Sequence, residues 1–284
     1  MKRILLTGGN GQVGWELRRT LGPLGTVTAL GRDKLDLADA DAIRQAIRAV
    51  GPDIIINAAA YTAVDQAEKE TELAMRVNGQ APGVMAEEAR KMGILLVHYS
   101  TDYVFDGRKD SPYTEEDTPA PLNAYGRSKL AGEQAVQASG CRHLIFRIGW
   151  VYGLRGNNFL RTILRLAEER EELRIVEDQF GGPTWSRLVA EATALALAGQ
   201  RPPEGLYHLA SGGYTSWHGF AEAILARSSK RRTRDPSLTA IPTQEYPLPA
   251  ARPQNSRLAC GKLAQEISIQ LPDWQDTLDL CLDA

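Results

Sequence analysis

The chain has 284 residues, a mass of 31.1 kDa and a formal net charge of −2 at pH 7. This length can bury a substantial core, whereas the near-neutral charge gives no basic field for nucleic acid. The N-terminal segment lacks the pattern of a signal peptide or a membrane span, and the three cysteines lack the spacing of metal ligands. We therefore expect a cytoplasmic protein that binds neither nucleic acid nor a membrane.

Apolar runs that suit buried parallel strands alternate with segments of helical periodicity along the chain. The expected strands span residues 4–6, 26–30, 53–57, 94–99, 144–149, 174–176 and 206–209. The expected helices span residues 12–21, 39–50, 73–92, 159–169, 187–198, 216–226 and 274–282, and a further helix begins near Tyr125. This alternation predicts an α/β protein with a Rossmann-type, doubly wound parallel sheet.

A glycine-rich turn separates the first expected strand from the first expected helix. Gly8 and Gly11 would let backbone N–H groups approach a pyrophosphate at the positive end of the helix, and Gly14 would let helix and strand pack closely. A flexible loop is the alternative interpretation. Three glycines at this spacing, between a strand and a helix, favour a dinucleotide site.

Tyr125 and Lys129 lie four residues apart, so they share one face of the helix expected there. A nearby ammonium group favours the phenolate and would lower the pKa of Tyr125 from its ordinary value near ~10. The hydroxyl could then exchange a proton with a carbonyl oxygen. The alternative is an exposed helix pair without a chemical role.

Residues 100–107 follow the strand expected at 94–99, at the edge where open α/β sheets bind their ligands. Together with the two motifs above, this segment resembles the extended short-chain dehydrogenase/reductase family. The resemblance implies that Thr101 hydrogen-bonds the reacting oxygen beside the proton donor Tyr125, while Lys129 also orients the nicotinamide ribose. A strand-end or turn residue is the alternative interpretation of Thr101.

The resemblance also implies two structural parts. Residues 1–150 would form the NAD(P)-binding Rossmann domain, and residues 151–284 would form mainly a smaller substrate-binding cap. Later segments, about 172–215, would return to the Rossmann domain, because the chain of such proteins crosses between the two parts.

Six strings resemble more narrowly the branch of this family that reduces the 4-keto group of nucleotide-linked deoxysugars: residues 11–17, 57–65, 100–105, 150–153, 178–184 and 252–258. The likeness implies reduction of dTDP-4-dehydro-L-rhamnose to dTDP-L-rhamnose by hydride transfer from NADPH, in dTDP-rhamnose biosynthesis. One alternative is a nucleotide-sugar epimerase that retains NAD. The other is a non-catalytic regulatory subunit resembling that of methionine adenosyltransferase.

The cofactor contacts follow from the motifs and the resemblance. Arg32 could pair with a 2′-phosphate, whereas Asp33 could accept hydrogen bonds from a free ribose hydroxyl; NADPH is favoured, with NADH as the alternative. The expected cofactor-binding residues are Gly8, Gly11, Gln12, Val13, Gly14, Arg32, Asp36, Leu37, Ala58, Ala59, Ala60, Tyr61, Thr62, Tyr125 and Lys129.

The resemblance implies substrate contacts from three regions of the chain: Thr101, Asp102, Tyr103 and Trp150 near the deoxysugar, with Asn255 and Arg257 at the distal nucleotide. The paired N–H groups of an arginine suit a diphosphate. The structural alternatives are a core role for Trp150, a strand cap at Tyr103 and a surface cation at Arg257.

Glu16 and Glu191 match glutamates that help Mg²⁺ bridge a homodimer in some relatives. Carboxylate oxygens are ligands that such hard cations favour. Two acids on exposed helix faces need no metal, so a homodimer without Mg²⁺, or a monomer, is the alternative.

Overall fold

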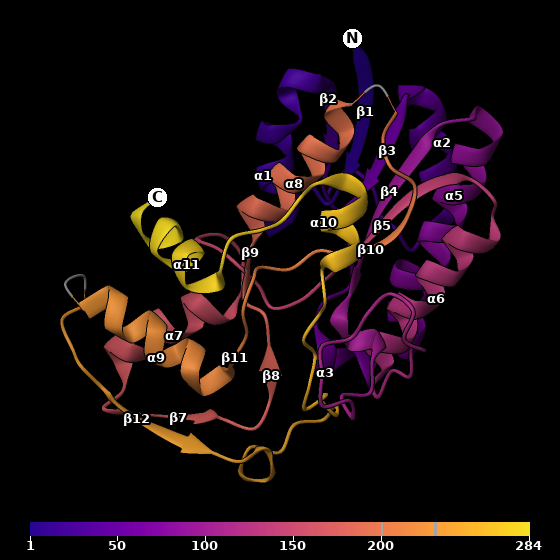
Figure 1. Ribbon diagram of the computed structural model, residues 1–284. Helices are drawn as coiled ribbons and strands as arrows, with labels where there is room; N and C mark the ends of the chain where they lie inside the picture. Colours follow the sequence, from indigo (N-terminus) through magenta and orange to yellow (C-terminus); the bar gives the residue numbers. More distant parts are fainter. Residues whose placement is uncertain (200, 230–231) are drawn as a thin grey trace.

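The computed structural model describes residues 1–199, 201–229 and 232–284. A six-stranded sheet with helices on both faces forms the larger part, and helices with short strand pairs form a smaller part beside it (Figure 1). The α/β, Rossmann-type architecture expected from the sequence is confirmed.

The strands of the large sheet run parallel in the order β10, β5, β4, β3, β1 and β2. Their bounds are β1 (Lys2–Thr7), β2 (Gly25–Leu30), β3 (Ile54–Asn57), β4 (Leu95–Thr101), β5 (Arg142–Ile148) and β10 (Gly205–His208). After β2 the chain crosses back over β1 and forms β3 on its other side. Ligands of open α/β sheets bind outside the carboxyl ends of the strands at such a switch.

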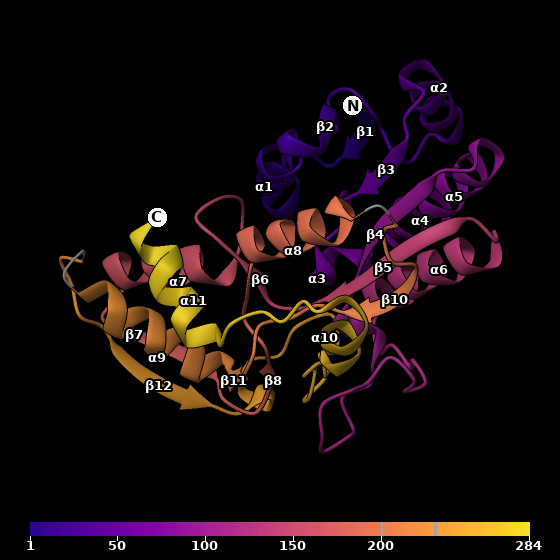
Figure 2. The same ribbon diagram turned by 45° about the horizontal axis from the view of Figure 1, so that its top comes forward.

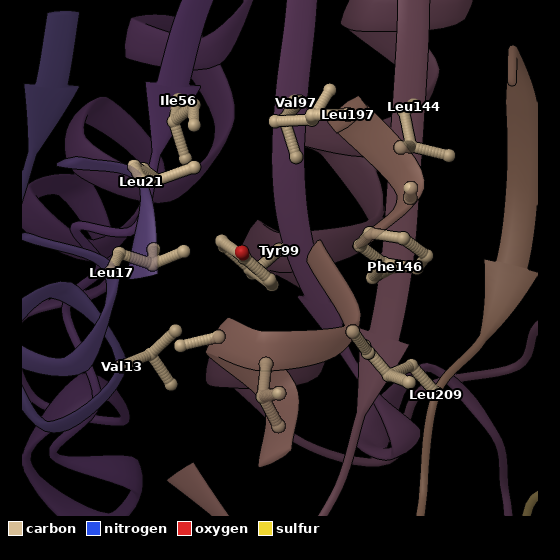
Figure 3. Packing of buried hydrophobic residues seen from close by; sticks show 14 of the residues in the cluster. Val13, Leu17, Leu21, Ile56, Val97, Tyr99, Leu144, Phe146, Leu197 and Leu209 are labelled. Carbon is tan, nitrogen blue, oxygen red and sulfur yellow. The ribbon is translucent and has the colours of Figure 1, made fainter. Parts of the chain in front are cut away.

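Strand side chains alternate between two helical layers. Ile4 and Leu6 pack with the layer that contains α1 (Gln12–Thr20), α8 (Ser186–Ala198) and α10 (Gly261–Ile267), whereas Leu5 packs with the opposite layer. That opposite layer contains α2 (Ala40–Val50), α5 (Ala81–Met92) and α6 (Ala124–Ala138). Figure 3 shows the Tyr99 ring between Leu17 and Phe146 in the first of these cores.

The single helix expected at residues 73–92 is divided into three pieces. They are α4 (Thr71–Met75), a π-helical turn η2 (Arg76–Gln80) and α5. Pro82 in the first turn of α5 has no N–H group, so it cannot bond the Asn78 carbonyl four residues earlier. The backbone widens there, and a Cβ on Gly132 of α6 would lie 2.2 Å from the Asn78 oxygen.

The smaller part has its own core and forms a cap beside the sheet (Figure 2). Tyr152, Phe220 and Trp274 lie at its centre. Its helices are α7 (Phe159–Glu169), α9 (Trp217–Ser228) and α11 (Trp274–Asp283). Its strands pair as β6 (Val151–Tyr152) with β9 (Thr184–Trp185), β7 (Glu172–Val176) with β12 (Ser237–Ile241), and β8 (Phe180–Gly181) with β11 (Thr215–Ser216).

The chain crosses between the two parts more than once. Helix α8 and strand β10 lie in the large part, whereas β7 pairs with β12 in the cap. Helix α10 returns to the large part, where Leu263 joins the core beneath β10. The remaining short elements are α3 (Val64–Ala67) and the 3₁₀ turns η1 (Gly22–Leu24), η3 (Asp102–Val104) and η5 (Thr243–Glu245).

Within the described ranges, each helix is too short or too polar to cross a membrane.

The core beside Tyr99 gives a test of the fold. Phe146 is fully buried, and its ring stacks on Tyr99 with the centroids 6.1 Å apart. We expect Phe146→Ala to lower the free energy of unfolding by roughly 3–5 kcal/mol, because it leaves a cavity. The control Leu195→Ala, at a side chain 66% exposed on α8, should change it by less than about 0.5 kcal/mol. Urea unfolding followed by circular dichroism measures both, and equal losses would contradict the expectation.

Candidate active site

The turn after β1 brings three segments of backbone into close contact. Gly8 adopts a φ of +71°, and a Cβ there would lie 2.6 Å from the backbone N of Ala59. A Cβ on Gly14 would lie 2.0 Å from the Gly8 oxygen. Among the described side chains none caps α1 after Gly11, so the first N–H groups of this helix are free to bind an anion.

Helix α6 directs Tyr125 and Lys129 into the same cavity. Asn123 caps the helix, because its Oδ1 accepts a hydrogen bond from the Gly126 N–H at 2.8 Å. Lys129, only 2% exposed, donates from Nζ to the Tyr99 carbonyl at 2.6 Å. Burial lowers the pKa of Lys129 to about 8, an effect that nearby Glu133 opposes. At neutral pH the ammonium form therefore still dominates.

The carboxyl end of β4 supplies Thr101 and Asp102. Thr101 donates from Oγ1 to Asp102 Oδ1 at 2.9 Å and accepts from the Tyr103 N–H at 3.1 Å. Burial raises the pKa of Asp102 to about 6, while the nearby hydroxyls of Ser256 and Thr101 oppose the rise. These contacts fix the Thr101 hydroxyl at the end of the strand.

The pKa of Tyr125 differs from the sequence expectation. Removal from water raises this pKa to about 12, although the Thr101 hydroxyl opposes the rise. The Lys129 ammonium is directed at the Tyr99 carbonyl, and burial is the stronger influence on the phenol. The expected lowering is thus corrected: Tyr125 is protonated at neutral pH, which is the state that a proton donor requires.

A cavity of about 660 Å³ runs along the carboxyl ends of the strands, from the glycine turn to Trp150. It is lined by Gly8, Gly11, Gln12, Val13, Arg32, Asp36, Leu37, Ala58, Ala59, Ala60, Tyr61, Thr62, Thr101, Asp102, Tyr125, Lys129 and Trp150, among others. Of the expected cofactor-binding residues only Gly14 is outside this lining, since it packs beneath Gly8. The structure therefore brings the two sequence motifs to one cavity.

At one end of the cavity the two candidate ribose contacts differ. Arg32 lines the cavity, whereas Asp33 lies outside its lining, where its Oδ1 is 3.5 Å from the Asn10 amide nitrogen. This arrangement suits a phosphate on the ribose better than a free hydroxyl, because the cation faces the cavity and the acid does not.

Trp150 lines the cavity and also belongs to the core of the cap. Its backbone has a φ of +47°, which is uncommon for a residue with a side chain. The indole Nε1 donates to Ser256 Oγ at 3.1 Å, and the ring stacks on Trp217 with the centroids 3.4 Å apart. Tyr103 lies outside the cavity lining and packs edge-on against the Tyr125 ring.

Asn255 and Arg257 lie outside the lining of this cavity. The Asn255 amide donates to the carbonyls of Lys109 and Ser111, and its Oδ1 accepts from Arg257 Nε at 2.8 Å. Arg257 also lies over the Tyr214 ring, 4.6 Å from its centroid. Asn255 therefore holds the 109–111 loop in place, and nucleotide contacts by these two residues stay predictions.

Glu16 has arginine partners in this structure. Its carboxylate lies 3.4 Å from Arg187 Nε and 3.5 Å from Arg19 Nη1, whereas Glu191 is exposed on α8. Across residues 1–199, 201–229 and 232–284, no group of three His, Cys, Asp or Glu side chains could hold a metal. The two arginines account for Glu16 without an ion, so Mg²⁺ has no support here.

Two positioning contacts escaped the sequence analysis. Asn78, in the π turn, exchanges hydrogen bonds with both backbone groups of Tyr61 and donates to Ser128 Oγ at 3.0 Å on α6. Asp65 and Arg252 form a two-pronged ion pair with both distances at 2.7 Å. Asp65 and Arg252 belong to two of the strings noted above, but nothing in either string indicated that they meet.

The family model described as the RmlD substrate binding domain matches residues 1–284. The chain belongs to this family. A relative from Burkholderia thailandensis, named dTDP-4-dehydrorhamnose reductase, is 50% identical over 291 residues, which cover 99% of this chain and 98% of the relative. A relative of the same name from Escherichia coli strain K12 is 47% identical over 96% of this chain and 94% of its own length. The resemblance inferred from the motifs is confirmed.

Solved structures agree with this membership. A dTDP-4-dehydrorhamnose reductase from Bacillus anthracis, in complex with NADP, superposes with a TM-score of 0.93 at 35% identity, over 99% of both chains. A UDP-glucose 4-epimerase from Thermus thermophilus, in complex with NAD, gives a TM-score of 0.84 at 23% identity. The second likeness shows a shared fold.

The glycine turn yields a test of nucleotide binding. Gly14→Ala should weaken NADPH binding by at least about tenfold, because its Cβ would force the Gly8 carbonyl out of the turn. Gly22→Ala is the matched control, since a Cβ there meets nothing within 4 Å. Titration of NADPH fluorescence measures both affinities. Unchanged binding by Gly14→Ala would contradict the importance of this packing.

Asp102 yields a test based on pH. Because folding raises the pKa of Asp102, its protonated carboxyl stabilises the folded state. This stabilisation is fully present below about pH 3.8, the ordinary pKa of the group, and is lost as pH rises through about 6. Asn cannot ionise, so Asp102→Asn should become progressively more stable relative to the wild-type chain between about pH 4 and pH 7. Chemical unfolding across this range measures the difference. A difference that does not vary with pH would contradict the raised pKa of the Asp102 carboxyl.

Proposed function

We propose that the chain reduces dTDP-4-dehydro-L-rhamnose to dTDP-L-rhamnose with NADPH, in dTDP-rhamnose biosynthesis. The proposal rests on one observation: Thr101, Tyr125 and Lys129 line the same cavity as the glycine turn. The proposal also draws on relatives that bear the name of this reductase and span nearly the whole chain. A non-catalytic regulatory protein would have no need for this arrangement.

The glycine turn and α1 would hold the pyrophosphate of NADPH, which supplies the hydride when bound. Arg32 would pair with the 2′-phosphate, and its position in the cavity supports NADPH over NADH. Ala58 to Ala60 leave room beside the cofactor because their side chains are small. Lys129, fixed by the Tyr99 carbonyl, would orient the nicotinamide ribose.

Tyr125 would donate the proton that converts the ketone oxygen to a hydroxyl. Its raised pKa keeps the phenol protonated before the reaction, and Lys129 provides a positive charge that would stabilise the phenolate formed afterwards. The Thr101 hydroxyl would donate a hydrogen bond to the same oxygen and polarise the carbonyl. For this the hydroxyl must turn away from Asp102 Oδ1, which accepts its hydrogen bond in the structure.

Asp102, Tyr103 and Trp150 are proposed to contact the deoxysugar. Asn255 and Arg257 are proposed to act at the distal nucleotide, Asn255 through the loop that it holds and Arg257 through its guanidinium. A homodimer in the cytoplasm is the proposed assembly. Its bridging by Mg²⁺ through Glu16 and Glu191 stays outside the proposal, since Glu16 is already paired with arginines.

Replacement of Tyr125 by phenylalanine separates chemistry from binding. Tyr125→Phe should lose about 10²–10⁴-fold in turnover, the usual contribution of a positioned acid. Affinity for NADPH should stay within about twofold, because only a hydroxyl is removed. Tyr246→Phe is the control, since Tyr246 is an exposed tyrosine outside the cavity. The assay follows NADPH oxidation with dTDP-4-dehydro-L-rhamnose and identifies the sugar product.

The same assay distinguishes the alternatives. A nucleotide-sugar epimerase would convert its substrate without net consumption of NADPH, and a regulatory protein would show no turnover in the wild-type chain. Near-normal turnover by Tyr125→Phe would reject its role as the proton donor.

A further inference from the structure

The linker that leaves the large sheet for the cap borders the cavity described above. After β6 it forms a loop of residues 153–158, here called the strap, before α7 begins at Phe159. Figure 2 shows the loop between β6 and α7 reaching toward α1. Two strap residues, Gly156 and Asn157, line the cavity that Gly11 and Gln12 also line. The strap therefore lies beside the part of the cavity where the glycine turn would hold a pyrophosphate.

One contact between the strap and α1 is a hydrogen bond. Asn158 donates from Nδ2 to Gln12 Oε1 at 2.8 Å, and the same amide contacts the carbonyls of Gly153 and Arg155. Gly156 has a φ of +69°, and a Cβ there would lie 3.0 Å from Gln12 Cγ. The strap thus follows a path that a glycine permits and that a larger residue at position 156 would push away from α1.

The other contact is a stack of side chains. The Arg155 guanidinium lies over the Trp15 ring of α1, 3.5 Å from the ring centroid. Arg18 lies over the same ring at the longer distance of 5.2 Å. Arg155 is an exposed residue of the strap, whereas Trp15 is half-buried on α1. A cation close to an indole face is attracted to it, and Arg155 is the only described strap residue that makes this contact.

We propose that the strap closes over the pyrophosphate end of the cofactor site, and that the Arg155–Trp15 stack holds it closed and slows the release of NADPH. The inference rests on the proposed use of NADPH. A reductase must exchange its cofactor in every turnover, so a strap that opens and closes suits this activity. The hydrogen bond from Asn158 and the Arg155–Trp15 stack would hold the strap closed during the reaction and, because each is weak, still permit release.

The test measures association and dissociation rates of NADPH separately, by stopped-flow fluorescence with the full chain. The variants are Arg155→Ala, Trp15→Leu and the double variant. Arg18→Ala is the matched control, because it removes the same charge from the same ring and leaves the strap contact intact. Thermal unfolding of each variant verifies that it is folded.

Each single variant should raise the dissociation rate by about three- to tenfold, as expected for the loss of one cation–π contact. The double variant should release NADPH no faster than the faster single variant, because both changes remove the same stack. Arg18→Ala should leave the dissociation rate within about twofold of the wild-type value.

Four results would overturn the proposal in distinguishable ways. A slower association with unchanged dissociation in Arg155→Ala would mean that Arg155 only attracts the anionic cofactor. An equal rise in the dissociation rate for Arg18→Ala would mean that charge near Trp15, and not the strap, retains the cofactor. Failure of the wild-type chain to bind NADPH would reject the cofactor itself, whereas normal binding with unchanged release rates would reject the strap alone.

Discussion

The hydrogen bond from the buried Lys129 ammonium to the Tyr99 carbonyl constrains the centre of this molecule. A charge removed from water is costly unless it is bonded, so α6 must lie where Nζ reaches the backbone of β4. The approach of α6 requires glycine at two positions: a Cβ on Gly126 would lie 2.2 Å from the Tyr103 oxygen, and Gly132 meets the π turn. Tyr125, one turn before Lys129, is placed by the same constraint.

Burial decides the protonation states of polar groups around the hydrogen bond between Lys129 and the Tyr99 carbonyl. The phenol of Tyr125 and the imidazole of His98 are both held in their neutral forms, because burial raises the first pKa and lowers the second. Asn57 donates from Nδ2 to His98 Nδ1 while its Oδ1 accepts from the Thr7 hydroxyl, so Thr7, Asn57 and His98 form a chain of neutral hydrogen-bonding groups. Glu133, which forms a buried ion pair with Arg147, is the acid that opposes the lowering of the Lys129 pKa.

Polar contacts join the segment around Arg252 and the strap to the large part. Arg252 pairs with Asp65 of α3, and Asn123 donates to the Ala251 carbonyl at 2.8 Å. The strap contacts α1. Single polar contacts of this kind contribute modestly because water competes for the same groups. The two parts can thus stay aligned around a ligand while individual contacts open.

The sequence by itself determined the α/β alternation, the glycine turn and the Tyr125–Lys129 spacing, because each depends on residues close together in the chain. The alternation of Ile4, Leu5 and Leu6 between two cores follows directly from strand geometry. Glycine positions and the proline at 82 are equally local signals, although the pattern of residues 73–92 predicts a continuous helix where the structure has a π turn.

Only the tertiary structure decided which distant segments share the cavity and what burial does to its chemistry. The pKa of Tyr125 rises because surrounding segments exclude water, an effect that outweighs the neighbouring charge visible in the sequence. Asn255 binds the backbone of a loop about 145 residues away, and the strap meets α1 across a similar separation. Such contacts depend on how the whole chain packs, so no local pattern of residues could specify them.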